Sequence, residues 1–275
     1  MTPGAPKARS FADLRARTLA GVAMAALAAL ALGLGGWVAA IFAAACAGAM
    51  GWELRRMLAG RFDGAGWAIA GAGVAASLAT QGAFFRSGLA VTAACLIAAL
   101  ILTRAERGWT RAATLIGGGY VAVACAAMVG LRDDPLYGWE AVLWVILVVV
   151  ATDIGAYFAG RIIGGPKLWP RVSPSKTWAG LGGGMAAATA VGAIFSSATT
   201  GTLIHEVAVV SGVMAAVSQG GDLAESALKR RAGVKDSSNL IPGHGGVLDR
   251  MDGLMAAVLV AAVITFLRGK SVFIW

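Results

Sequence analysis

Nine long apolar runs, almost free of charged side chains, constrain this chain more than any other feature. A transmembrane helix needs about 20 mostly apolar residues, and soluble domains contain few runs of that kind. The chain is 58% hydrophobic and 13% charged, about half the charged fraction of a typical soluble domain. We therefore predict an all-α fold: a polytopic integral membrane helix bundle with about nine transmembrane helices. The runs are 19–34, 37–50, 66–84, 89–103, 112–131, 139–160, 178–198, 203–219 and 254–267.

The distribution of basic residues tests this layout independently. If the N-terminus is cytoplasmic and the spans alternate, nineteen of the 23 Lys and Arg residues fall in cytoplasmic segments. Cytoplasmic loops of membrane proteins carry such an excess. The net charge of +9 then faces the anionic inner leaflet, and no nucleic-acid partner is predicted. We expect a multi-pass protein of the inner (cytoplasmic) membrane with its active site facing the cytoplasm.

The N-terminal segment has two possible interpretations. Four basic residues precede an Ala/Leu run, as in a signal peptide, but a second apolar run follows at once, which favours an uncleaved first span. The glycine-rich break at 33–36 predicts either a tight hairpin or a re-entrant pair. The basic residues are Lys7, Arg9, Arg15 and Arg17.

The whole chain, 1–275, is predicted to be a single membrane domain. Residues 1–135 would supply N-terminal helices with a possible role in forming a homodimer, and 139–275 would supply the catalytic helices and loops. Runs such as Gly117–Gly119 and Gly182–Gly184 predict close helix packing. The three cysteines lie in apolar runs without metal-ligand spacing and are interpreted as small buried hydrophobic residues. They are Cys46, Cys95 and Cys125.

Polar residues concentrate in two predicted cytoplasmic segments, and the longer one is 220–253. Within it Asp222, Glu225, Ser226 and Lys229 are spaced so that they share one helix face. Such a face taken alone equally describes the solvated end of an amphipathic helix.

The sequence that follows favours an anion site. It reads Pro242-Gly-His244-Gly-Gly246 and then Asp249-Arg-Met-Asp252. Glycines beside a histidine let backbone N–H groups turn toward an anion. Hard carboxylate oxygens suit Mg²⁺, so we predict Asp222 and Asp249 as the metal ligands. Asp252 alone is a weak signal, because aspartate at a helix start is an ordinary cap.

The second polar segment, 161–178, contains Ser173-Pro-Ser-Lys176-Thr177. We interpret it as a turn opening a helix whose first N–H groups could bind phosphate. The alternative is a loop of cations lying over lipid headgroups. Asp153, inside an apolar run, should face a cavity or a partner. Glu53, Arg55 and Arg56 could contribute to the interior face, but we interpret them as an ordinary membrane-edge cluster.

The ordered pattern from Ser226 through Asp252 resembles the signature of the phosphatidate cytidylyltransferase family. The blocks Gly221–Ser226 and Ser173–Thr177 are similar to other blocks of that family, and the resemblance covers the chain from about Asp153 onward. Family members often carry Lys-Lys-Thr and a nearby Glu where this chain has Ser175-Lys176-Thr177 and Ala179. That departure leaves Lys176 in place but puts roles for positions 175 and 179 in doubt.

The resemblance implies Mg²⁺-dependent transfer of CMP from CTP to phosphatidic acid, giving CDP-diacylglycerol and pyrophosphate in phospholipid biosynthesis. A monovalent cation could accompany the Mg²⁺. The implied catalytic residues are Asp222, Asp249, Lys229, Lys235, His244 and Arg250. The implied substrate-binding residues are Ser173, Lys176, Thr177, Ser226, Arg230, Asp236, Gly245, Gly246 and Asp153.

This chemistry needs no general base, because a phosphate monoester has a second pKa of about 6 and its oxygen is already ionised. Two alternatives stay open. A CTP-dependent polyprenol or lipid-alcohol kinase would release CDP and would need a base for the attacking hydroxyl. An anion transporter would distribute polar groups through the membrane midplane, whereas here only Asp153 intrudes.

Overall fold

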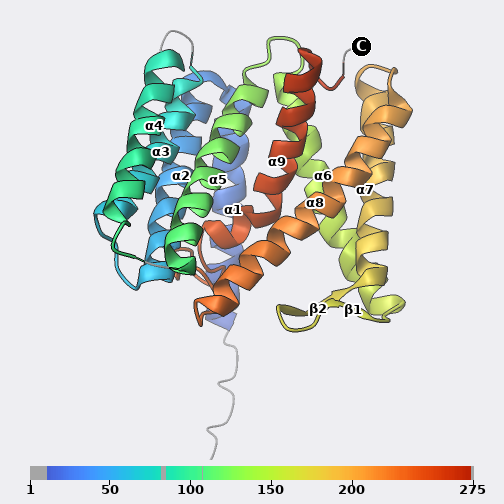
Figure 1. Cartoon of the computed structure of the whole chain (residues 1–275). Coiled ribbons are helices and arrows are strands. Elements are labelled where there is room, and N and C mark those ends of the chain that lie inside the picture. Colours follow the sequence, from blue (N-terminus) through green and yellow to red (C-terminus); the bar gives the residue numbers. More distant parts are fainter. Residues whose placement is uncertain (1–10, 82–84, 107, 274–275) are drawn as a thin grey trace, which may run out of the picture.

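The structure is a computed structural model that describes residues 11–81, 85–106 and 108–273. Lys7 and Arg9, on which the orientation partly rests, lie outside these residues. The described part of the chain forms nine helices and two short strands (Figure 1). The elements are α1 (Phe11–Leu34), α2 (Gly36–Ala59), α3 (Gly64–Ala79), α4 (Phe85–Leu102), α5 (Trp109–Arg132), α6 (Gly138–Ile162), β1 (Lys167–Trp169), β2 (Ser173–Thr177), α7 (Trp178–Thr199), α8 (Ile204–Arg231) and α9 (Leu248–Arg268).

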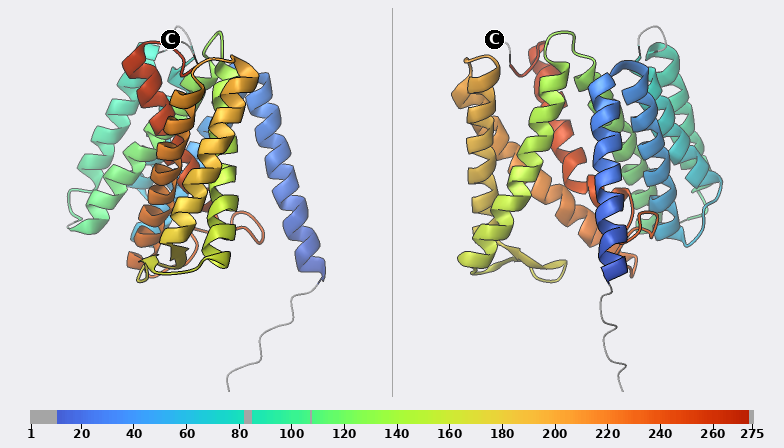
Figure 2. Two further views of the ribbon diagram at one scale, coloured as in Figure 1. Left: turned by 90° about the vertical axis from the view of Figure 1, so that its right-hand side faces the viewer. Right: turned by 180° about the vertical axis from the view of Figure 1, so that it is seen from behind.

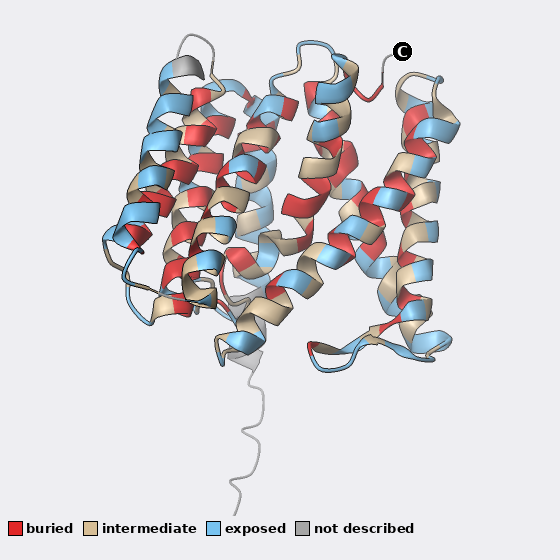
Figure 3. Cartoon of the chain, viewed as in Figure 1, coloured by how far each residue is buried: buried red, intermediate tan, exposed pale blue. Residues whose placement is uncertain are grey.

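Six of these helices, α2 and α5 to α9, are long and apolar enough to cross a membrane. The other three contain shorter apolar stretches, Thr18–Leu34, Gly64–Ala79 and Ser87–Leu102. Large apolar side chains such as Ile162 and Phe266 point outward, while buried residues line the helix faces that meet inside the bundle (Figure 3). An apolar outer surface of this kind suits lipid rather than water. The prediction of an all-α polytopic membrane protein is confirmed.

The break between the first two helices is a tight hairpin. Gly35 and Gly36 adopt φ values of +67° and +52°, a region that glycine enters at little cost. Helix α1 runs along the outside of the bundle in both views of Figure 2. Helix α2 continues to Ala59, beyond the predicted end at residue 50, because the polar residues of its last turns are buried within the protein.

Small residues set the spacing between helices. A Cβ atom on Gly118 would lie 2.7 Å from the Ile69 side chain, and one on Gly183 would collide with Ala159. This is the close packing expected of glycine in membrane helices. One apolar cluster includes side chains from α2, α3, α5 and α9, such as Leu54 and Met255. The N-terminal and C-terminal helices therefore share a core.

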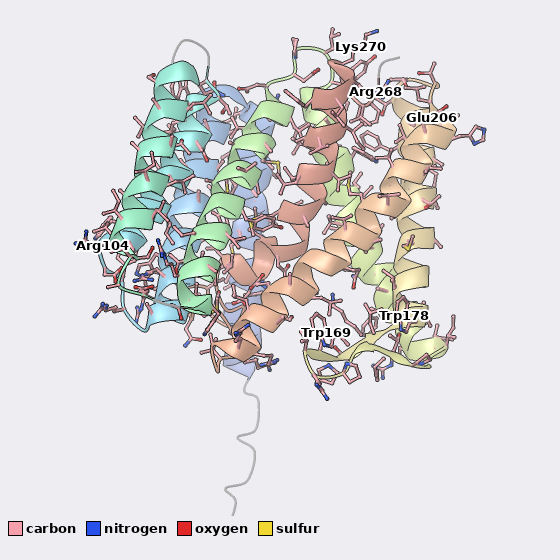
Figure 4. All side chains as sticks on the ribbon, in the orientation of Figure 1. Arg104, Trp169, Trp178, Glu206, Arg268 and Lys270 are labelled. Atoms are coloured by element: carbon pink, nitrogen blue, oxygen red, sulfur yellow. The ribbon has the colours of Figure 1, made fainter. Side chains whose placement is uncertain are left out.

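The loops separate into two ends. Arg104, Trp169 and Trp178 lie at one end of the bundle, and Glu206, Arg268 and Lys270 lie at the other (Figure 4). We call the first the basic end; it also holds the start of α1, the β1–β2 hairpin and the loop 232–247. This separation agrees with the alternation predicted from the basic residues. That the basic end faces the cytoplasm stays a prediction.

The segment around Lys176 differs from the sequence expectation. Residues Ser173–Thr177 were predicted to form a turn that opens a helix; they form strand β2, which pairs antiparallel with β1, and the helix follows directly. Pro174 restricts the residue before it to extended conformations, which favours a strand. Helix α7 begins at Trp178, where the predicted apolar run begins, and the Thr177 side chain caps it by accepting a 3.0 Å hydrogen bond from the Gly180 amide.

Candidate active site

Helix α8 brings the predicted polar face into the middle of the protein at the basic end. It crosses the front of the bundle diagonally, from beside α7 toward the lower end of α5 (Figure 1). On its face the Ser226 hydroxyl donates to Asp222 at 3.2 Å, and the Lys229 ammonium lies 3.1 Å from a Glu225 carboxylate oxygen. The helical spacing of these four residues was therefore interpreted correctly.

Lys176 links strand β2 to α8. Its ammonium lies 2.5 Å from an Asp222 carboxylate oxygen and donates to the Gln219 side chain at 2.8 Å. The Gln219 amide in turn reaches Asp153 of α6 at 3.5 Å. Asp153 thus meets a polar partner inside its apolar helix, as expected for an ionisable group at that depth.

A polar pocket of about 320 Å³ opens around this network. It lies between α6, β2, the start of α7 and α8, and Tyr157 and Arg161 form part of its wall. Four of the site residues predicted from the sequence are close to it: Asp153, Lys176, Thr177 and Asp222 line it directly.

Asp249 is surrounded by donors. One carboxylate oxygen is 2.6 Å from the Lys229 ammonium. The other accepts hydrogen bonds from the amide and hydroxyl of Ser237, at 2.9 and 2.8 Å, and from the Gly246 amide at 2.8 Å. The Asp249 side chain is 4% exposed. In this structure its immediate role is to fold the loop 232–247 onto the ends of α8 and α9.

Glu53 lies in the interior of the protein, the alternative that the sequence analysis did not prefer. Its side chain is fully buried, and its oxygens accept hydrogen bonds from the Ser238 hydroxyl at 2.6 Å, the Val247 amide at 2.9 Å and the Leu248 amide at 2.7 Å. Arg55, also buried, forms ion pairs with Asp63 and Glu106. The interpretation of this segment as a membrane-edge cluster is wrong: Glu53 lies just beyond the apolar run 37–50, and its burial depends on partners far along the chain.

Several other predicted residues lie toward the surface. Lys235, Asp236 and Arg250 are exposed. The His244 ring lies against α1, with its Nε2 atom 3.3 Å from the point where a Cβ on Gly21 would stand. The Arg230 guanidinium donates to the Val234 carbonyl at 3.2 Å. Among the described hydrogen bonds, none joins these residues directly to the Asp222 carboxylate, so they border the network around it.

Asp252 faces the α8 carboxylates across the α8–α9 crossing. The helices approach closely there, because a Cβ on Gly221 would lie 2.9 Å from the Asp252 carbonyl oxygen. The negative charges of Asp222 and Asp252 interact repulsively. The helix that supplies Asp249 therefore presents Asp252, one turn further along, toward Asp222.

These residues fit Mg²⁺ only together with substrate. Among the described residues no three His, Cys, Asp or Glu side chains converge to hold a metal ion. Mg²⁺ is often bound by one or two carboxylates, with water and substrate phosphate completing its octahedron. The mutually repelling carboxylates of Asp222 and Asp252 suit such a partial site, while Asp249 is engaged with Lys229 and the loop.

An apolar groove of about 600 Å³ lies on the other side of α8, between α5, α8 and α9. Its wall includes Ile116, Val217 and Met255, and it reaches Glu225 and Asp252. Asp222 lines the polar pocket, and its neighbour Gly221 lines the groove. Two cavities of opposite character thus lie on either side of α8, lined by the adjacent residues Gly221 and Asp222.

We expect Gly246→Ala to destabilise the protein by about 1–3 kcal/mol, the usual cost of overpacking. An added Cβ would collide with the Ser237 hydroxyl and the Glu53 carboxylate, both of which are buried. Thermal unfolding in detergent measures the effect. Gly130→Ala in α5 is the matched control, because nothing lies within 4 Å of its Cβ position. Equal unfolding midpoints for the two variants would contradict the packing argument.

The fold and site define a multi-pass membrane protein with a polar site at one end of its helix bundle. The chain belongs to the cytidylyltransferase family, whose pattern matches residues 15–267. It is similar to the phosphatidate cytidylyltransferase of Brucella suis biovar 1 (strain 1330), with 46% identity over 177 residues. That match covers 64% of this chain and spans 64% of the length of the Brucella protein.

Two further relatives carry the same name. The phosphatidate cytidylyltransferase of Haemophilus influenzae is 48% identical over 130 residues, which cover 46% of this chain and 45% of that protein. The one from Bacillus subtilis (strain 168) is 37% identical over 137 residues, covering 50% of this chain and 51% of that protein.

Proposed function

We propose that this protein transfers CMP from CTP to phosphatidic acid, giving CDP-diacylglycerol and pyrophosphate. The names of its relatives support this activity. The single observation that carries it is the placement of a polar pocket lined by Asp222 and an apolar groove lined by Gly221 and Asp252 on either side of α8. A water-soluble nucleotide and a membrane lipid need cavities of these two kinds.

In this proposal the nucleotide occupies the polar pocket. Lys176 and Arg161 supply positive charge at its wall, which would attract the triphosphate and offset the repulsion between the two anionic substrates. Lys176 is paired with Asp222 in this structure, so phosphate or a cation would rearrange that pair on binding.

The lipid would enter the groove between α5, α8 and α9. Its wall is almost entirely apolar until Glu225 and Asp252, so acyl chains would lie along α5 and α9 with the phosphate near the α8–α9 crossing. Burial of apolar chain surface would provide most of the binding energy, at about 25 cal/mol per Å².

Mg²⁺, when bound, would supply positive charge that stabilises the charge developing during transfer. Asp222 and Asp252 would hold the ion. Asp249, the second ligand predicted from the sequence, is paired with Lys229 in this structure and would join them on a rearrangement of that pair. An ionised oxygen of the lipid phosphate would attack the α-phosphorus of CTP. A new P–O bond forms, the bond between the α-phosphorus and its bridging oxygen breaks, and pyrophosphate leaves with that electron pair. Lys176 and Lys229 would stabilise the negative charge.

We further propose that the protein resides in the inner membrane with its basic end in the cytoplasm, where CTP is available. The excess of Lys and Arg at that end supports this orientation. A homodimer through glycine-bearing helix faces is also proposed, because such faces associate in membranes.

The proposal predicts that purified protein in detergent, given CTP, Mg²⁺ and phosphatidic acid, releases pyrophosphate in equal amount to CDP-diacylglycerol. Chelation of Mg²⁺ should abolish turnover, and added Mg²⁺ should restore it. With labelled CTP, release of CDP would instead indicate the kinase alternative. Folded protein that forms no nucleotide product would refute the proposed activity.

A further inference from the structure

Glu53 reaches from α2 into the loop that connects α8 to α9. It lies 195 residues before Leu248 in the sequence, yet its carboxylate accepts hydrogen bonds from the Leu248 amide at 2.7 Å and the Val247 amide at 2.9 Å. The Ser238 hydroxyl donates to the same carboxylate at 2.6 Å. An N-terminal helix therefore holds the loop that connects α8 to α9.

These contacts take the place of a normal helix cap. The first N–H groups of a helix have no partner within it. Val247, at the N-cap position of α9, makes no capping hydrogen bond through its own side chain. Glu53 supplies acceptors to the amides at this helix start, and its negative charge would also suit the positive end of the helix dipole.

The loop is held from both sides. Asp249 accepts from the Ser237 amide and hydroxyl on one side, and the Ser237 hydroxyl also lies 3.4 Å from Glu53. Gly246 passes between the two carboxylates, with its amide bonded to Asp249 and no space for a side chain toward Glu53. A displacement of Glu53 would therefore move the start of α9 as well as the loop.

We propose that Glu53 is a positioning residue: by anchoring the first turn of α9 it places Asp249 and Asp252 opposite Asp222 of α8. This inference rests on the proposed nucleotidyl transfer for its effect on rate, but the anchoring itself does not depend on that activity. Glu53 has no place in the polar pocket or the apolar groove, so it acts through the residues it holds.

The test is Glu53→Gln, which keeps the side-chain volume but replaces one acceptor oxygen with an NH₂ donor facing other donors. Hydrogen exchange should show the Val247 and Leu248 amides opening about 10- to 100-fold more often, the equivalent of losing a hydrogen bond to a charged group. Exchange in α7 should not change. In the activity assay kcat should fall by about 100-fold, as a shift of about 1 Å in a catalytic group can cause. The KM for CTP should stay close to wild type, because the polar pocket contains no residue of α9.

Glu140→Gln, in the first turn of α6, is the matched control and should leave both measurements at wild-type values. Ser238→Ala removes one donor to Glu53 and should show the same pattern at smaller size, about 3- to 10-fold. Ser238→Ala combined with Glu53→Gln should open these amides no more often than Glu53→Gln alone, because both changes break the same contact between residues 53 and 238. If Glu53→Gln cannot be purified folded, Ser238→Ala carries the test.

Unchanged exchange at Val247 and Leu248 in the folded variant would overturn the anchoring. Faster exchange in all helices would show that Glu53 contributes only to the general stability of the protein, and this result would also overturn the proposed anchoring. If the wild-type protein releases no pyrophosphate, the proposed activity fails by itself, and the exchange measurement still decides whether Glu53 anchors α9.

Discussion

Asp222→Asn should lower kcat by about two to three orders of magnitude, the loss seen when one fixed electrostatic contact to a transition state is removed. The carboxylate lies 2.5 Å from Lys176 and faces Asp252 across the helix crossing. The neutral amide would bind Mg²⁺ weakly and would leave Lys176 without its partner. The measurement is pyrophosphate release at saturating CTP and phosphatidic acid.

The control for this variant is Glu206→Gln, which changes an acid in the first turn of the same helix. Figure 4 shows Glu206 at the end of the bundle opposite the site, so its activity should equal that of the wild type. Because Asp222 is partly exposed, with a side chain 33% accessible, Asp222→Asn should change the unfolding temperature little. Near-normal turnover of folded Asp222→Asn would refute a role for this carboxylate in metal binding.

Asp249→Asn should abolish turnover and also destabilise the protein, by about 3–5 kcal/mol, the cost of removing one partner from a buried ion pair. Lys229 is 11% exposed and depends on Asp249 and Glu225 for neutralisation. An asparagine amide would also oppose the Ser237 and Gly246 N–H groups with a donor whenever its oxygen faces Lys229.

Lys229→Met provides the companion variant. If the pair is the source of the lost stability, Asp249→Asn combined with Lys229→Met should be less destabilised than the sum of the two single changes. Thermal unfolding of the four proteins in detergent closes this cycle. Strict additivity would show that the ion pair contributes little, and the loop contacts of Asp249 would then account for its effect.

The helices and the shared face on α8 were predictable because they depend on local periodicity. Apolar runs mark the spans, and the spacing from Asp222 to Lys229 follows from 3.6 residues per turn. The early stop predicted for α2 was wrong, because a run of apolar residues ends where charge begins, while burial of Glu53 and Arg55 depends on partners far along the chain.

Partners across helices were harder to predict. The sequence motif indicated Asp222 and Asp249, and both lie at the basic end, but the close approach of α8 and α9 at Gly221 brings Asp252 toward Asp222. Strand β2 was not predicted because it forms by pairing with β1 after the chain reverses at Pro170, and so short a strand has no periodic pattern of its own. The metal assignment stays a prediction.

The contact between α2 and the start of α9 has a consequence for biosynthesis. A ribosome delivers α2 to the membrane early, and segments made first generally fold first. The amides that donate hydrogen bonds to Glu53 belong to Val247 and Leu248, which are synthesised after most of the chain has been translated. The loop 232–247 therefore packs late against a helix that is already in the bilayer, and the site at the basic end stays incomplete until α9 has been inserted.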